Sequence, residues 1–168
     1  MNLFIRTAEP GDIAAMVGLL GALFAIEKDF TPNREKQERG LALLLDGSPP
    51  RAAFVADHGG SVVGMVTGQL LVSTAEGGLT ALVEDLVVAP AFRGRGVGSR
   101  LLAGIHGWAR AAGAVRLQLL ADRDNGPALD FYGRSVWRET NLFCLRNREP
   151  KTTLCPGRRG HGHREGKS

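Results

Sequence analysis

The stretch that most constrains what this chain can fold into is residues 82–102. It opens as an apolar run rich in β-branched residues, which Pro90 ends because proline has no N–H for a sheet ladder. Gly94, Gly96 and Gly98 follow, and after them the apolar residues recur with a helical period. The order of strand, glycine-rich turn and helix start predicts an anion site, because unpaired N–H groups and the helix dipole favour a phosphate there.

Two common phosphate-binding motifs do not fit this turn. Ser99 stands where the third glycine of GxGxxG would fall, and the chain contains no GxxxxGK[ST]. The turn instead resembles the acyl-CoA-binding signature [R/Q]-x-x-G-x-[G/A] of the GNAT acetyltransferase superfamily, with Arg93, Gly96 and Gly98 in the key positions. A strand end of the form V-V-x-P-x-[F/Y] precedes it at residues 87–92. A plain strand–turn–helix connection is the competing interpretation.

A second segment, about thirty residues further on, resembles the same family. Asn125, Ala128, Phe131 and Tyr132 fill the key positions of the GNAT pattern N-x-x-A-x-x-[F/L]-Y. The family continues F-Y-x-x-x-G-F, but Val136 stands here in place of that glycine. If the usual turn needs a positive φ, the end of this helix and the strand after it must be built differently.

The element order predicts one α/β domain over residues 1–146. Strands are expected at residues 3–7, 52–56, 61–72, 82–88 and 116–121, and helices at 12–24, 33–45, 96–112 and 125–132. The mixture of antiparallel and parallel connections gives an α/β fold with a mixed sheet. The resemblance implies a GNAT-type, mostly antiparallel central sheet flanked by about four helices.

The positive charge of the chain belongs to its C-terminal end. The formal net charge is +4, and residues 147–168 carry six basic against two acidic side chains, so the rest of the chain is neutral. This basic tail is rich in Pro and Gly and is predicted to be disordered. A basic tail can bind nucleic acid, but an idle solvated terminus is favoured because the body has no excess positive charge.

Cysteine usage and hydropathy favour the cytoplasm. The N-terminus lacks the charged and apolar regions of a signal peptide, and no run of about 18 apolar residues predicts a membrane-spanning helix. Two cysteines, Cys144 and Cys155, form neither a disulfide framework nor a metal motif. Cys144 is expected to be buried as a small apolar residue, and no metal site is expected.

The resemblance implies transfer of an acetyl group from acetyl-CoA to a primary amine. The turn would bind the pyrophosphate through its N–H groups, and the splayed end of the central strand would pair with the pantetheine arm. The residues expected to bind acetyl-CoA are Leu86, Val87, Val88, Arg93, Gly94, Arg95, Gly96, Val97, Gly98, Ser99, Asn125 and Ala128.

Two residues are candidates for proton transfer. Glu84 stands nine positions before Arg93, matching the glutamate of polyamine acetyltransferases, and would take the proton of the amine through water. A structural ion pair is nearly as good an account of Glu84, and Asp85 is expected on the opposite face of the strand. Tyr132 would give a proton to the CoA thiolate; otherwise it is a core tyrosine beside Phe131.

Three hypotheses remain open at this stage. An N-acetyltransferase acting on a small-molecule amine, or on a protein amine, is favoured over a non-catalytic acyl-CoA sensor and over a nucleic-acid-associated module. The acidic residues Glu27, Asp29, Glu35 and Glu38 are interpreted as a solvated helix surface, with a negative lip that attracts an amine as the alternative. Members of the family often pair as homodimers through their later strands, and the sequence does not decide this.

Overall fold

The computed structural model describes residues 2–26, 31–46 and 50–147. The chain divides into two compact units, with the boundary between Arg138 and Glu139. All the described helices and strands lie in the first unit. The predicted domain boundary after residue 146 stays a prediction, and residues 148–168 of the predicted tail lie outside the described residues.

The centre of the first unit is a five-stranded sheet in the order β1-β2-β3-β4-β5. The strands are β1 (Leu3–Thr7), β2 (Arg51–His58), β3 (Ser61–Ser73), β4 (Gly78–Val88) and β5 (Ala114–Leu119). The first four pair antiparallel and β5 runs parallel to β4, which confirms the predicted mixed, mostly antiparallel sheet. β4 begins four residues earlier than predicted, because Ser73 pairs with Gly78 across a tight connection. β5 begins two residues earlier than predicted.

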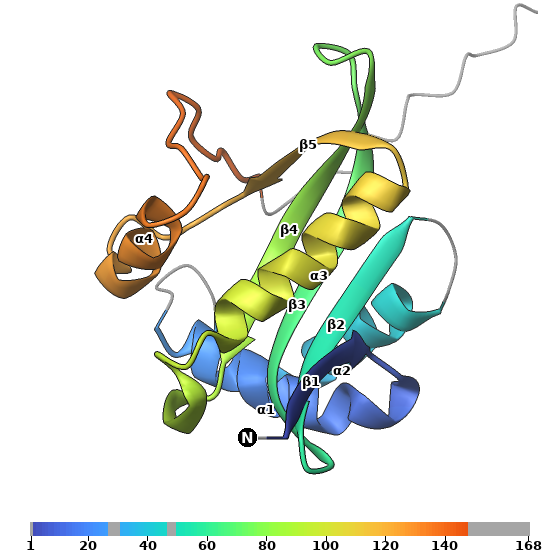
Figure 1. Cartoon of the computed structure of the whole chain (residues 1–168), viewed down its shortest axis with the longest axis vertical. Coiled ribbons are helices and arrows are strands. Elements are labelled where there is room, and N and C mark those ends of the chain that lie inside the picture. Colours follow the sequence, from blue (N-terminus) through green and yellow to red (C-terminus); the bar gives the residue numbers. More distant parts are fainter. Residues whose placement is uncertain (1, 27–30, 47–49, 148–168) are drawn as a thin grey trace, which may run out of the picture. The chain divides into compact units, whose positions relative to one another are not determined.

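Four α-helices surround the sheet, as predicted. They are α1 (Ile13–Phe24), α2 (Arg34–Leu45), α3 (Val97–Ala111) and α4 (Gly126–Gly133), with short 3-10 turns η1 (Pro10–Asp12) and η2 (Pro90–Phe92). Figure 1 shows α3 lying along one face of the sheet, with α1 and α2 on the other face. No helix in the described part of the chain is both long and apolar enough to cross a membrane.

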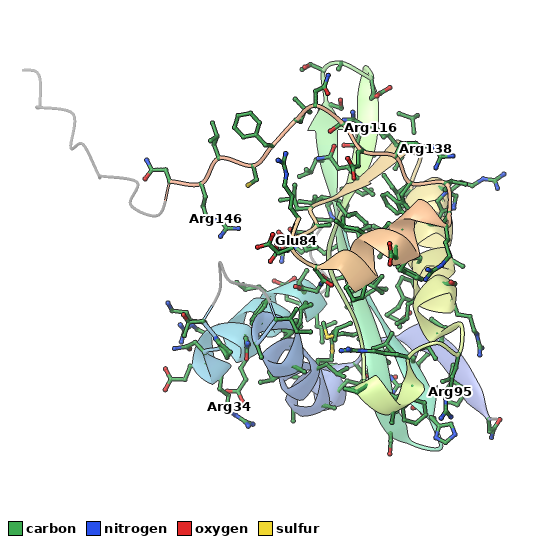
Figure 2. The ribbon with its side chains drawn as sticks, turned by 90° about the vertical axis from the view of Figure 1, so that its left-hand side faces the viewer. Arg34, Glu84, Arg95, Arg116, Arg138 and Arg146 are labelled. Carbon is green, nitrogen blue, oxygen red and sulfur yellow. The ribbon has the colours of Figure 1, made fainter. Side chains whose placement is uncertain are left out.

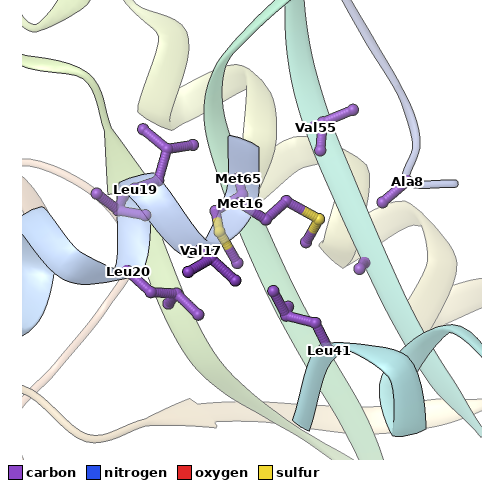
Figure 3. Close-up of a cluster of buried hydrophobic side chains, with 10 residues drawn as sticks. Ala8, Met16, Val17, Leu19, Leu20, Leu41, Val55 and Met65 are labelled. Atoms are coloured by element: carbon purple, nitrogen blue, oxygen red, sulfur yellow. The ribbon is translucent and has the colours of Figure 1, made fainter. Parts of the chain in front are cut away.

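The core consists of two clusters, one on each face of the sheet, because neighbouring residues of a strand point to opposite faces. Met65 joins the cluster beneath α1 and α2, seen in Figure 3, whereas Val66 joins the cluster beneath α3 with Leu101 and Ile105. A Cβ on Gly68 would lie 2.8 Å from Cδ1 of Ile105, so this glycine allows α3 to approach β3 closely.

The chain after α4 departs from the expected pattern. The C-cap residue of α4, Arg134, has φ −78°, and residues 134–147 contain no strand. Within the second unit Cys144 is exposed, so its predicted burial is wrong. Described residues 139–147 form no helix or strand, and they therefore provide no regular apolar face that would bury Cys144.

Candidate active site

The two parallel strands β4 and β5 separate halfway along β4. Their pairing ends where Val83 lies beside Leu119, whereas β4 continues to Val88 with only β3 as a partner. On this free edge the side chain of Arg93 donates a hydrogen bond from Nε to the carbonyl of Val88 at 3.0 Å. A free strand edge presents backbone N–H and C=O groups to which an amide-bearing chain can add.

A β-bulge in β4 lies at the point where the strands separate. Val66 pairs with Leu86 and Gly68 pairs with Val83, so two residues of β4, Glu84 and Asp85, lie opposite a single residue of β3. The residue opposite them is Thr67, whose hydroxyl donates to Oδ2 of Asp85 at 3.0 Å and accepts from the Asp85 N–H at 3.1 Å.

The bulge corrects the predicted direction of Asp85. Thr67 and Gln69 are two residues apart on β3 and therefore share a face. Thr67 bonds Asp85, and Nε2 of Gln69 donates a long hydrogen bond of 3.5 Å to Glu84, so both carboxyl groups lie on that same face. Figure 2 shows Glu84 on the side of the sheet that faces away from α3. The prediction that Asp85 points to the opposite face is wrong, because the extra residue breaks the two-residue alternation.

A cleft with about 350 Å³ of empty space, open to solvent, lies at the separation of the strands. Five of the residues singled out from the sequence line it: Glu84, Leu86, Asn125, Ala128 and Tyr132. Sequence reasoning missed the other lining residues, which are Leu23, Leu120, Ala121 and Asp122. The last three follow directly after β5, and side chains at the carboxyl end of a strand beside a separation are expected to reach a site there.

The two carboxylates at the bulge have different surroundings. Glu84 is exposed and lines the cleft, whereas Asp85 is half-buried. Burial raises the pKa of Asp85 to about 6, the bond from Thr67 opposes this rise, and the charge of Glu84 adds to it. Among the described residues, the lining of the cleft contains two carboxylates, Glu84 and Asp122, and no Lys or Arg. Its electrostatic character therefore favours a cation.

The glycine-rich turn leads into α3 with left-handed backbone at two positions. Gly94 has φ 70° and Gly96 has φ 77°, a region that side chains with a Cβ rarely adopt. Gly96 is the N-cap of α3 and, having no side chain, supplies no capping acceptor for the first-turn N–H groups. The first turn of α3 therefore presents N–H donors and the positive end of the helix dipole to a ligand.

Several side chains of the predicted acetyl-CoA-binding set have packing roles. Val87 and Val97 are buried, one on each face of the sheet, so only their backbone groups are available to a ligand. A Cβ on Gly98 would lie 3.3 Å from the ring of Phe131, so this glycine lets α4 pack against α3. The guanidinium of Arg95 lies 5.7 Å from the centre of the Phe92 ring.

The start and end of α4 place Asn125 and Tyr132 at the cleft. Oδ1 of Asn125 accepts a hydrogen bond from the N–H of Ala128 at 3.2 Å, so Asn125 caps the helix as its sequence position predicts. The ring of Tyr132 packs edge-on against Phe131 at 5.2 Å and Trp137 at 6.0 Å. Tyr132 is thus both a packed aromatic residue and a lining residue of the cleft.

The acidic residues of α2 lie in ion pairs on the helix surface. Glu38 pairs with Arg34 at 2.8 Å, and Glu35 lies 4.0 Å from Arg39, each at i,i+4 spacing. This supports the interpretation of a solvated helix surface; Glu27 and Asp29 lie outside the described residues. Within the described ranges no three His, Cys, Asp or Glu side chains gather as a metal site would require.

Comparison with known proteins agrees with this geometry. The model of the "Acetyltransferase (GNAT) family" matches residues 20–136. Streptothricin acetyltransferase of Streptomyces lavendulae is 30% identical over 153 residues, covering 77% of this chain and 78% of the relative. Aminoalkylphosphonate N-acetyltransferase of Salmonella typhimurium is 30% identical over 140 residues, covering 82% of this chain and 86% of the relative.

Solved structures share the fold. The crystal structure of a transcriptional regulator from Bacillus halodurans matches with a TM-score of 0.76 at 24% identity, covering 87% of this chain and 99% of the other. An aminoglycoside acetyltransferase from an uncultured soil metagenomic sample matches with a TM-score of 0.66 at 26% identity, covering 88% of this chain and 99% of the other. The arrangement of sheet, turn and helices is therefore one that acetyltransferases use.

Proposed function

Because the chain belongs to the GNAT family of acetyltransferases, we propose that it transfers the acetyl group of acetyl-CoA to the primary amine of a small molecule. A protein amine is the second choice of acceptor. The observation that carries the proposal is the single cleft that Glu84, Asn125 and Tyr132 line beside the separated edge of β4.

The chain has the groups that acetyl-CoA needs. The pyrophosphate requires N–H donors and positive charge, which residues 94–99 and the side chains of Arg93 and Arg95 supply at the N-terminus of α3. The pantetheine arm carries amides, which the free edge of β4 at Leu86 to Val88 is suited to pair. Since Oδ1 of Asn125 is used in the helix cap, its amide N–H groups are the ones suited to hold the arm from the other side.

Glu84 is the proposed base and Tyr132 the proposed acid of the reaction. Acetyl-CoA supplies the activated acetyl thioester, and the acceptor amine must lose a proton to attack it. Glu84, exposed in the cleft, takes that proton through a water molecule. The phenol of Tyr132, which lines the same cleft, gives a proton to the thiolate that leaves.

The residues that line the cleft narrow the range of amines that can serve as acceptor. The two relatives named above are acetyltransferases of streptothricin and of an aminoalkylphosphonate, and one of the similar solved structures is an aminoglycoside acetyltransferase. Acceptor amines with an anionic group and without one therefore both occur among similar proteins. A phosphonate next to Glu84 and Asp122 would be repelled, and no Lys or Arg among the described lining residues would offset that repulsion. A small molecule with more than one ammonium group is therefore the favoured acceptor.

Calorimetry with acetyl-CoA, followed by thiol release with a panel of aminoglycosides, polyamines and aminoalkylphosphonates, tests the proposal. We expect Tyr132→Phe and Glu84→Gln to lower kcat on the order of 100-fold and to leave the affinity for acetyl-CoA within about threefold. Glu35→Gln, an exposed glutamate on α2, is the charge-matched control and should keep full activity.

Three outcomes are informative. No binding of acetyl-CoA would refute the proposed site at residues 93–99. Binding without turnover on any amine would favour an acyl-CoA sensor. Full activity of both cleft variants would refute the assigned proton-transfer roles while leaving the reaction in place.

A further inference from the structure

The carboxyl group of Asp85 follows Glu84, a lining residue of the cleft, and has no part in the roles assigned above. It does not itself line the cleft, it accepts a hydrogen bond from Thr67, and no Lys or Arg of the described residues pairs with it. A buried carboxylate without a cationic partner normally costs stability, so its position at this bulge calls for a reason.

The bond between Asp85 and Thr67 is reciprocal. Thr67 donates its hydroxyl proton to the side chain of Asp85 and accepts the backbone N–H of the same residue. The two bonds close a small ring across β3 and β4 and satisfy the N–H that the extra residue removes from the regular ladder. They fix the backbone of β4 at the residue next to Glu84.

The bulge sets the face of the sheet on which the side chains of Glu84 and Asp85 lie. Val83 and Leu86 both pack in the cluster beneath α3, although three residues apart, which a regular strand with a two-residue repeat does not allow. The bulge therefore places the two residues between them, Glu84 and Asp85, together on the opposite face. Without it one of the two would point toward α3.

We infer that Asp85 and Thr67 are positioning residues for Glu84: their reciprocal hydrogen bonds hold the β4 bulge, and the bulge directs the Glu84 carboxylate into the cleft. The inference rests on the proposed role of Glu84 as the base. It adds to that role a second carboxyl group and a threonine that act through Glu84 and do not touch the substrate.

The charges around Asp85 make the arrangement sensitive to pH. Glu84 is the charged neighbour on its own strand, and β3 presents the uncharged Thr67 and Gln69. α1, packed over this face, has no titratable side chain between Ile13 and Phe24. Across the cleft stand Asp122 and Tyr132. Ionisation of Asp85, whose pKa burial raises to about 6, therefore adds a second negative charge beside Glu84.

The test compares Thr67→Val, Thr67→Ser and Asp85→Asn by the pH profile of kcat and by the KM for acetyl-CoA. We expect Thr67→Val to lower kcat about tenfold or more with KM within about twofold, and Thr67→Ser to restore most of the activity. Asp85→Asn should remove the change of kcat near pH 6 that follows the ionisation of Asp85, because an amide does not ionise. Thr80→Val, a buried threonine elsewhere in β4, is the matched control and should behave as the wild type.

Glu84→Gln separates this inference from the proposed function. Wild-type kcat in Glu84→Gln would overturn the base and the inference together. An inactive Glu84→Gln combined with unchanged kcat and pH profiles in Thr67→Val and Asp85→Asn would overturn the inference alone. If Thr67→Val does not fold, the pH profile of Asp85→Asn and the kcat of Thr67→Ser decide whether the inference stands.

Discussion

Two groups of carboxylates, one near β1 and one at the β4 bulge, differ in whether a cation pairs with them. Near β1, Arg6 donates to both oxygens of Asp12 at 2.7 and 2.9 Å and to Asp57 at 3.1 Å. At the β4 bulge, Asp85 is bonded to the neutral hydroxyl of Thr67 and lies beside a second carboxylate, Glu84. A guanidinium neutralises the first group, whereas no Lys or Arg in the described part of the chain pairs with the Asp85 carboxylate.

The pKa values of the two groups move in opposite directions. The hydrogen bond from Arg6 lowers the pKa of Asp12, whereas burial raises the pKa of Asp85 to about 6. Ionised Asp12 therefore stabilises the fold and ionised Asp85 destabilises it. The described residues provide a guanidinium for Asp12 and none for Asp85, and the proposed positioning role beside Glu84 gives a reason for this difference.

The largest effect should follow from removing the neutralising cation. We expect Arg6→Met to lower the free energy of unfolding at pH 7 by about 2 to 3 kcal/mol, since it removes the guanidinium that pairs with two mostly buried carboxylates and leaves them only backbone N–H donors. Urea unfolding measures this. kcat at a temperature where the variant is folded should stay unchanged, because none of these residues lines the cleft.

Arg34→Met on α2 is the control for Arg6→Met. The side chain of Arg34 is 70% exposed and pairs only at the helix surface with Glu38, so its loss should cost about 0.3 to 0.5 kcal/mol. Equal losses in the two variants would show that the Arg6 group is no more than a surface ion pair, and a fall in kcat for Arg6→Met would link it to the cleft.

The second effect is the pH dependence of the stability, which has opposite signs for Asp85 and Asp12. Because the pKa of Asp85 is higher in the folded state than in the unfolded chain, its contribution to stability falls as the pH rises from about 4 through 6. The contribution of Asp12, whose pKa is lowered, is instead lost as the pH falls below about 4.

Asp85→Asn isolates the first of these contributions. The free energy of unfolding of Asp85→Asn minus that of the wild type should increase by about 2 kcal/mol between pH 4 and pH 7.5. Using a difference between two pH values removes the constant effect of placing an amide beside Thr67. A difference that does not change with pH would mean that Asp85 ionises in the folded protein as it does in the unfolded chain.

Much of the fold could be predicted from local signals. Asn33 and Asn125 cap their helices with the side chain, and Gly113, just after α3, has φ 83°, each as its position in the sequence predicts. The two family motifs also indicated Glu84, Asn125 and Tyr132 as residues of one site, and all three line the same cleft. Such signals depend on a few neighbouring residues and can therefore be read without the rest of the chain.

The parts that failed depend on contacts distant in sequence. The bulge at Glu84 and Asp85 arises from a mismatch with Thr67 and from the packing of Val83 and Leu86 beneath α3. Gly68 within β3 is a local sign of a bulge or a close approach, but it does not show that the extra residue lies in β4. The burial of Cys144 was inferred from residue type, and described residues 139–147 form no sheet or helix to bury it. Asp122 was missed because its access to the cleft depends on where β5 separates from β4, which the local sequence does not show.

The smallest effect should come from a third set of carboxylates, on the surface of α2. Glu35→Gln with Glu38→Gln removes two negative charges that are paired at i,i+4 and open to solvent, so stability should fall by no more than about 0.5 kcal/mol. The KM for the amine should change less than about twofold at 0.15 M salt, where exposed charges are screened over about 8 Å. A larger rise in KM that disappears at high salt would instead make α2 a negative lip that attracts the amine, and the carboxylates that select the substrate would then extend beyond the cleft.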